Sequence, residues 1–195
     1  MKSSTEGSQE IWALEAQLEA ATDPQTKIDL LHELAWKLTL QDAPKAYGLA
    51  RQAYELSSSD EFEKTPYWQG IAGSLRSFIA INTDAGNYDQ ALTYSLQAVD
   101  ILDKIPDEKT EINLIKINVL GTVSWTYRCL GEYAISAEYA LRGLKIAQSS
   151  GMRRYEGGVL NILSVIYAES NDLPAARQVG QKVVEYCREA RNFQG

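Results

Sequence analysis

The sequence predicts an all-α fold, an α-α superhelix of stacked helix pairs, and two observations carry this prediction. First, a five-position pattern of small and large side chains occurs four times, in copies that begin at Ala46, Ala91, Ser136 and Ala176 and so lie 45, 45 and 40 residues apart. Second, the members of each copy have offsets 0, 3, 4, 7 and 10, which places all five on one stripe of an α-helix. A stripe with small side chains lets a neighbouring helix approach closely, and a period of this length is typical of a repeat array.

A second apolar run precedes each stripe, so the repeated unit is a pair of helices. These runs begin at Ile28, Leu75, Leu120 and Leu160. We therefore expect a repeat array over residues 26–190, with four pairs at about 26–57, 66–104, 110–149 and 152–189. Terminal repeats need a cap. Residues 1–25 are expected to supply a polar segment and a capping helix over about 9–21, with Ile11, Trp12, Leu14 and Leu18 as its apolar residues.

The short turns inside each pair contain residues that end one helix and begin the next. Residues suited to the left-handed conformation that ends a helix are Gly86, Gly131 and Asn171. Residues suited to capping the following helix are Asp42, Asn87 and Asp172. Pro44 and Pro174 then fall in the first helical turn, where a missing amide hydrogen costs nothing.

The stretches 85–92 and 130–133 resemble the inter-helix signature of the tetratricopeptide repeat. Ala91, Ser136 and Ala176 match its small packing position, and Ala98 and Gly143 match the next one. The similarity covers nearly the whole chain, although the repeats are longer than the usual length of about 34 residues. This long-repeat variant is similar to arrays in the amino-terminal regions of bacterial signalling proteins, ahead of nucleotide cyclase or kinase domains. The resemblance implies a scaffold or regulatory arm that takes part in signal transduction.

The last five residues, 191–195, repeat the pattern of residues 153–157, which open the fourth pair. We therefore expect a further repeat to begin at residue 191 and the chain to be truncated from a longer polypeptide.

Composition favours a packed, water-soluble body, with 45% hydrophobic and 23% charged residues. The net charge of −7 and the scattered basic residues argue against a nucleic-acid partner. No run of 18 apolar residues and no secretory segment occurs, so membrane insertion is not expected and the predicted location is cytoplasmic. Cys129 and Cys187 lack metal-ligand spacing and are expected to be buried thiols.

Catalytic signatures are missing from the sequence. The single histidine, His32, is adjacent to Glu33, and neighbours in sequence point in different directions on a helix. No nucleophile and base occur at a motif spacing, and no Gly-rich phosphate loop is found. The sequence thus predicts no enzyme activity in this fragment, no catalytic residue, no metal and no cofactor.

The first helix of each pair is expected to line a concave groove, and polar or aromatic residues off its apolar stripe are candidates for partner binding. By resemblance to tetratricopeptide repeats, these candidates are His32, Trp36, Arg76, Thr83, Asn118, Thr122, Trp125, Arg128 and Asn161. An equally good interpretation of the tryptophans is packing between repeats, and the arginines also suit a solvated helix face. A buried amide at Asn161 would hydrogen-bond a peptide backbone.

These residues favour a protein or peptide interaction module, whose ligand has basic or mixed charge because the surface is acidic. Two alternatives stay open. One is self-association into a homodimer through Ile11, Trp12 or the end of the chain after Tyr186; the other is a small-ligand sensor around Trp36 and Trp125.

Overall fold

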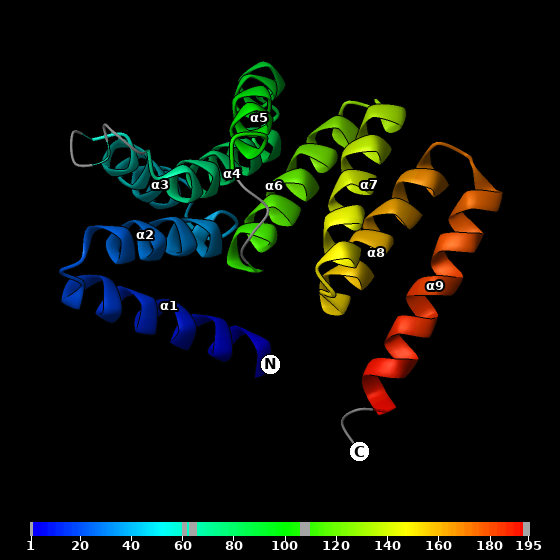
Figure 1. The fold of residues 1–195 in the computed structure, drawn as a ribbon, viewed down its shortest axis with the longest axis horizontal. Coiled ribbons are helices and arrows are strands. Elements are labelled where there is room, and N and C mark those ends of the chain that lie inside the picture. The colour runs from blue at the N-terminus through cyan, green and yellow to red at the C-terminus, as the bar shows by residue number, and fades with distance from the viewer. Residues whose placement is uncertain (1, 60–61, 63–65, 106–109, 193–195) are drawn as a thin grey trace. The chain divides into compact units, whose positions relative to one another are not determined.

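The computed structural model describes the backbone of residues 2–59, 62, 66–105 and 110–192. Over these residues the chain forms nine α-helices and no strand (Figure 1). Their bounds are α1 Lys2–Ala20, α2 Pro24–Leu38, α3 Ala43–Ser57, α4 Trp68–Asp84, α5 Tyr88–Leu102, α6 Thr110–Cys129, α7 Tyr133–Ser149, α8 Arg153–Glu169 and α9 Leu173–Asn192. The prediction of an all-helical fold, with four helix pairs after an amino-terminal helix, is confirmed.

Packing divides the chain into two compact units. Unit 1 is Met1–Ile105, which holds α1 to α5, and unit 2 is Pro106–Gly195, which holds α6 to α9. Within unit 1 the helices pair as α2 with α3 and α4 with α5, and α1 packs on α2. Within unit 2 the pairs are α6 with α7 and α8 with α9.

The turn residues adopt the conformations that the sequence predicts. Gly86, Gly131 and Asn171 have φ angles of 74°, 78° and 62°, so each ends its helix in the left-handed region. Asparagine tolerates this region better than other residues with a Cβ. Gly151, between the third and fourth pairs, has a φ of 66° and lies in the left-handed region just after α7 ends.

Two of the three predicted caps form. The carboxylate of Asp42 accepts a hydrogen bond from the backbone N–H of Lys45 at 3.0 Å, and that of Asp172 accepts one from Ala175 at 3.1 Å. Asn87 occupies the cap position of α5, but its side chain makes no capping hydrogen bond, so that prediction is wrong. The cap position alone does not orient the amide toward the helix.

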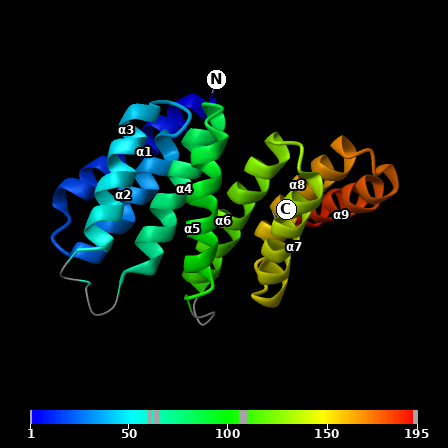
Figure 2. The same cartoon turned by 90° about the horizontal axis from the view of Figure 1, so that it is seen from above.

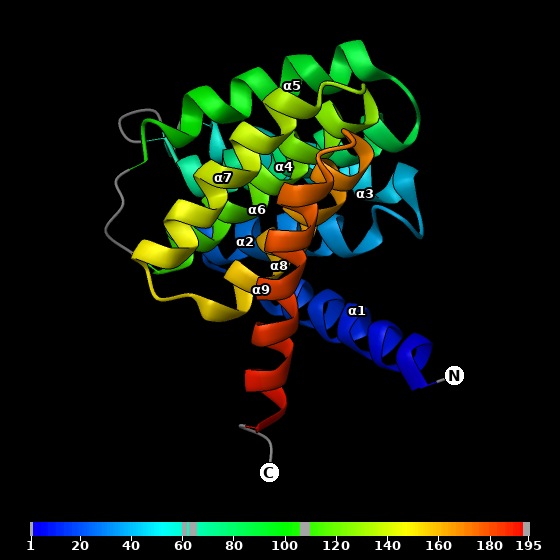
Figure 3. The ribbon, with the colours of Figure 1, turned by 90° about the vertical axis from the view of Figure 1, so that its right-hand side faces the viewer.

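The small residues of the stripes are buried where a helix has neighbours. Those with 0% or 1% exposure are Ala46, Ala50, Ala53, Ala91, Ser95, Ala98, Ser136 and Ala140. Ser136 also donates a hydrogen bond to the carbonyl oxygen of Ser124 at 2.7 Å, which ties α7 to α6. The fourth stripe, on α9, is only half-buried, and the C-terminal turns of α9 run clear of α7 and α8 (Figure 3).

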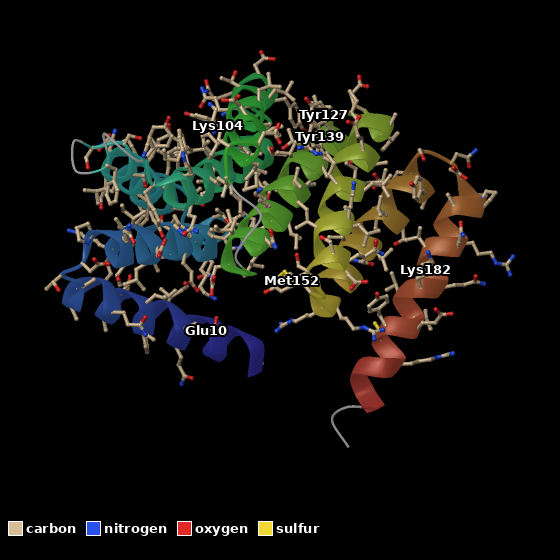
Figure 4. The ribbon with its side chains drawn as sticks, in the orientation of Figure 1. Glu10, Lys104, Tyr127, Tyr139, Met152 and Lys182 are labelled. Carbon is tan, nitrogen blue, oxygen red and sulfur yellow. The ribbon has the colours of Figure 1, made fainter. Side chains whose placement is uncertain are left out.

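The capping helix covers the first pair as expected, but it is longer and uses fewer apolar residues than predicted. It begins at Lys2 rather than near residue 9. Ile11 and Leu14 pack against Leu34 and Leu38 of α2, whereas Trp12 is 67% exposed. Trp12 follows Ile11 by one residue, about 100° around the helix, so both cannot lie on the narrow contact. Ion pairs flank this contact, and one joins Glu10 (labelled in Figure 4) to Lys37 at 2.7 Å.

Two glycines let α4 lie very close to α2 and to the end of α3. A Cβ at Gly73 would be 2.7 Å from Cγ of His32, and a Cβ at Gly70 would overlap Ile28 and Ser57. Toward α3 and α5, the ring centroid of Phe78 on α4 lies 4.8 Å from that of Tyr47 and 5.0 Å from that of Tyr94.

The cysteines differ from expectation. Cys129 ends α6 and Cys187 lies in α9, and both are exposed rather than buried. The expectation of buried thiols is therefore wrong, because the last turn of α6 and this part of α9 leave both side chains accessible to solvent.

Candidate binding surface

In unit 1, the first helices α2 and α4 lie alongside each other (Figure 2). This contact brings together three predicted groove residues, His32, Trp36 and Arg76. The guanidinium carbon of Arg76 on α4 is 3.3 Å from the ring centroid of Trp36 on α2, so these side chains stack. Both residues are half-buried. Stacking engages the face of a guanidinium, whose N–H donors lie in its plane. The pair therefore combines an aromatic surface with hydrogen-bond donors at one place.

His32, one turn before Trp36, takes part in the contact between α2 and α4. Its ring lies over Gly73, and its Nε2 is 3.4 Å from Oδ1 of Asp29. The same carboxylate accepts a hydrogen bond from the Tyr67 hydroxyl at 2.8 Å. Burial and this hydrogen bond raise the pKa of Tyr67, because both favour the neutral phenol. His32 is thus held in a network that fixes α2 against α4.

The two predicted threonines do not reach an accessible surface. Thr83 is only 3% exposed on α4, a helix on which α2, α3 and α5 all pack. Thr122 is 5% exposed and donates its hydroxyl hydrogen bond to the carbonyl oxygen of Asn118 at 3.0 Å. The hydroxyl of Thr122 is therefore satisfied inside its own helix.

In unit 2, Arg128 joins the first helices α6 and α8. Its Nη1 is 2.7 Å from Oε1 of Glu169, and its side chain is 28% exposed. Trp125 is half-buried and precedes Arg128 by three residues, which places the two on the same side of α6. Toward α7, α6 is fixed by a stack of Tyr127 on Tyr139, with ring centroids 5.5 Å apart (Figure 4). Burial raises the pKa of Tyr127.

The two predicted asparagines have different environments. Asn118 on α6 is half-buried, whereas Asn161 on α8 is exposed. The expectation of a buried amide at Asn161 is therefore wrong. Val165, one turn further along α8, is 39% exposed, so this face of α8 presents an amide next to an apolar side chain.

Sequence reasoning missed several residues of these surfaces. Asp29 lies three residues before His32, a spacing that indicates a shared helix face. No local signal pairs Glu169 with Arg128, because 41 residues separate them.

We name the accessible predicted residues as two surfaces. The first-helix surface of unit 1 comprises His32, Trp36 and Arg76, and the first-helix surface of unit 2 comprises Asn118, Trp125, Arg128 and Asn161. In the part of the chain that the structure describes, no group of three or more His, Cys, Asp or Glu side chains is arranged to hold a metal ion. Over the same residues, no helix is both long and apolar enough to cross a bilayer.

No protein-family model and no curated protein matches the chain. Solved structures do match it. A Rap protein complexed with competence and sporulation factor is similar with a TM-score of 0.73 and 17% identity, over 90% of this chain and 46% of that one. Aspartyl phosphate phosphatase F from Bacillus subtilis is similar with a TM-score of 0.72 and 15% identity, over 95% of this chain and 49% of that one. The chain thus spans about half the length of these two proteins.

A third solved structure matches this chain over most of its own length. The TPR-like repeats of a kinesin light chain from Podospora anserina match with a TM-score of 0.58 and 13% identity, over 96% of this chain and 90% of that one. At such identities the likeness concerns the fold. The chain has the fold of a tetratricopeptide-like helical repeat array, as its turn and stripe residues predict.

Proposed function

We propose that the chain is an interaction module that binds a protein or peptide segment, chiefly through the first-helix surface of unit 2. It would serve as the regulatory or scaffold arm of a larger cytoplasmic signalling protein, with no catalytic role of its own. The observation that carries the proposal is that tryptophan and arginine occur together, half-buried, on the first helices of both units.

This pairing suits binding for an energetic reason. Tryptophan and arginine supply much of the binding energy of protein interfaces when water is excluded around them. Side chains already held by neighbours lose less conformational entropy on binding. The bridge from Arg128 to Glu169 holds Arg128, and an arginine has five N–H donors, of which such a bridge uses few.

The similar structures support the proposal. One of them, the Rap protein, was solved as a complex with competence and sporulation factor, and the present chain matches 46% of that protein. The net charge of −7 favours a ligand with basic or mixed charge, since the protein's field attracts cations.

The test is affinity capture with the natural chain as bait, followed by calorimetry with each captured protein. We expect Trp125→Ala and Arg128→Ala each to cost about 1–3 kcal/mol of binding while leaving the thermal midpoint nearly unchanged. Arg142→Ala is the matched control, because Arg142 lies over Tyr139 on the second helix α7. Normal binding by both first-helix variants would move the recognition surface elsewhere, and unfolding of Trp125→Ala would make Trp125 a core residue.

A second candidate function, self-association, is favoured by the exposure of Trp12. Ile11, which the sequence suggested as part of the same contact, is buried against α2 and cannot supply it. Of the two α1 residues that the sequence suggested, Trp12, at 67% exposure, stays available for this contact, beside the end of the chain after Tyr186. Light scattering measures this directly: a dimer mass that Trp12→Ala reduces to a monomer supports self-association, and a monomer mass for the natural chain removes it.

A further inference from the structure

Unit 1 contains a pocket that belongs to neither first-helix surface. It has a volume of about 470 Å³ and lies where the end of α3, the start of α4 and the end of α5 meet. Its apolar walls include Tyr54, Phe62, Trp68 and Ile101, and its charged rim consists of Asp100 and Lys104. Aromatic walls beside one carboxylate are typical of sites for organic cations, because the ring faces and the carboxylate both attract positive charge.

Lys104 of the chain itself already places a cation between this carboxylate and an aromatic ring. Its ammonium nitrogen is 2.6 Å from Oδ2 of Asp100 and 5.7 Å from the ring centroid of Trp68. Lys104 (labelled in Figure 4) follows the end of α5, so its side chain reaches the pocket from the rim. The carboxylate and the indole ring therefore already share one cation.

This internal cation is held weakly. The side chains of Lys104 and Asp100 are 50% and 67% exposed, and an exposed pair four residues apart contributes little to stability. A lysine stem is flexible, so Lys104 can turn into solvent at small cost. The volume of the pocket is present while Lys104 sits at its rim, which leaves room for a second side chain along the aromatic walls.

We propose that this pocket binds a lysine or arginine side chain from a partner protein segment. The alkyl stem of the incoming residue lies against Tyr54 and Phe62, and its charged end replaces Lys104 between Trp68 and Asp100. The acidic net charge of the chain, −7, draws such a segment toward it. This inference goes beyond the proposed function, because it concerns other residues and stands whether or not the first-helix surfaces bind anything.

The experiment is an NMR titration of the natural chain with the tripeptide amide acetyl-Ala-Lys-Ala, observing the indole N–H of Trp68. The Trp68→Phe variant assigns that signal. We expect the lysine peptide to shift it, and the same peptide with norleucine in place of lysine to leave it in place. Lys104→Met should tighten binding about three-fold, because it removes the internal competitor, and Asp100→Asn should weaken it by a similar factor.

Matched variants separate the pocket from general charge attraction. Lys145→Met, at an exposed position of α7, and Asp89→Asn, at the start of α5, make the same charge changes away from the pocket and should leave the titration as it was. Three results would overturn the proposal. These are no shift of Trp68 even in Lys104→Met, an equal shift with the norleucine peptide, or a shift with choline but none with the lysine peptide, which would make the pocket a site for small free cations.

Discussion

Replacing Gly70 with alanine tests the close approach of α4 to α2. The added methyl group would overlap Cγ2 of Ile28 and Oγ of Ser57, and it would lie 2.9 Å from Cδ1 of Tyr67. Ile28 and Ser57 are both 0% exposed, so neither can move into solvent. Ser57 is also fixed by the hydrogen bond that its hydroxyl donates to the carbonyl of Ala53, at 2.6 Å. We expect Gly70→Ala to push α4 away from α2.

Two opposing effects set the change in the free energy of unfolding that Gly70→Ala causes. Alanine favours the interior of a helix over glycine by roughly 0.5–1 kcal/mol. Overpacking a core costs typically about 1–3 kcal/mol. Because the overlap involves buried atoms, the second effect wins, and we expect a net loss of about 1–2 kcal/mol in the free energy of unfolding.

Gly48→Ala is the matched control in the same unit. Gly48 lies inside α3, and a Cβ there meets no atom within 4 Å, so only the gain in helix propensity remains. This variant should be more stable than the natural chain by roughly 0.5–1 kcal/mol.

Urea unfolding followed by far-ultraviolet circular dichroism measures both changes. The midpoint should fall for Gly70→Ala and rise for Gly48→Ala, with unchanged slopes. In a chain of this size the thermal midpoint should also move by about 2–4 °C per kcal/mol. If Gly70→Ala stabilises the chain as Gly48→Ala does, the two helices are not in close contact and the reasoning fails.

Three further predictions concern the caps, the stripe and pH. Asp42→Ala should cost about 1 kcal/mol in urea unfolding, because its cap is formed, while Asn87→Ala should cost clearly less; equal losses would contradict this. Ala140→Leu, at a position 1% exposed, should cost about 1–3 kcal/mol by the same assay, whereas Ala134→Leu, at an exposed position of the same helix, should be nearly neutral; a neutral Ala140→Leu would mean that the wrong face was assigned. Burial and the hydrogen bond to a neighbouring tyrosine raise the pKa of Tyr94 to about 12, above its value of about 10 in the unfolded chain. The neutral Tyr94 phenol therefore stabilises the folded chain fully below about pH 10, and this stabilisation is lost as the pH rises toward about 12. Unfolding at about pH 9 and about pH 11 should show a smaller fall in stability for Tyr94→Phe than for the natural chain, and equal falls would refute the role of Tyr94.

The sequence by itself determined the helix pairs and the turns between them. The stripes fix which side of α3, α5 and α7 is buried, and Gly86, Gly131 and Asn171 mark the ends of α4, α6 and α8. This succeeds because periodicity and capping act over a few residues, so that neighbours in the chain contain the information.

Only the tertiary structure decided which first-helix residues are accessible. Each first helix contacts the second helix of its own pair and also the first helix of the other pair in its unit. More than one side of each first helix is therefore covered. That is why Thr83 and Thr122 are buried, whereas Asn161 is exposed. The stack of Trp36 with Arg76 and the bridge of Arg128 with Glu169 join residues 40 and 41 positions apart in the sequence. Contacts over such separations depend on the approach of two helices, which no local pattern records.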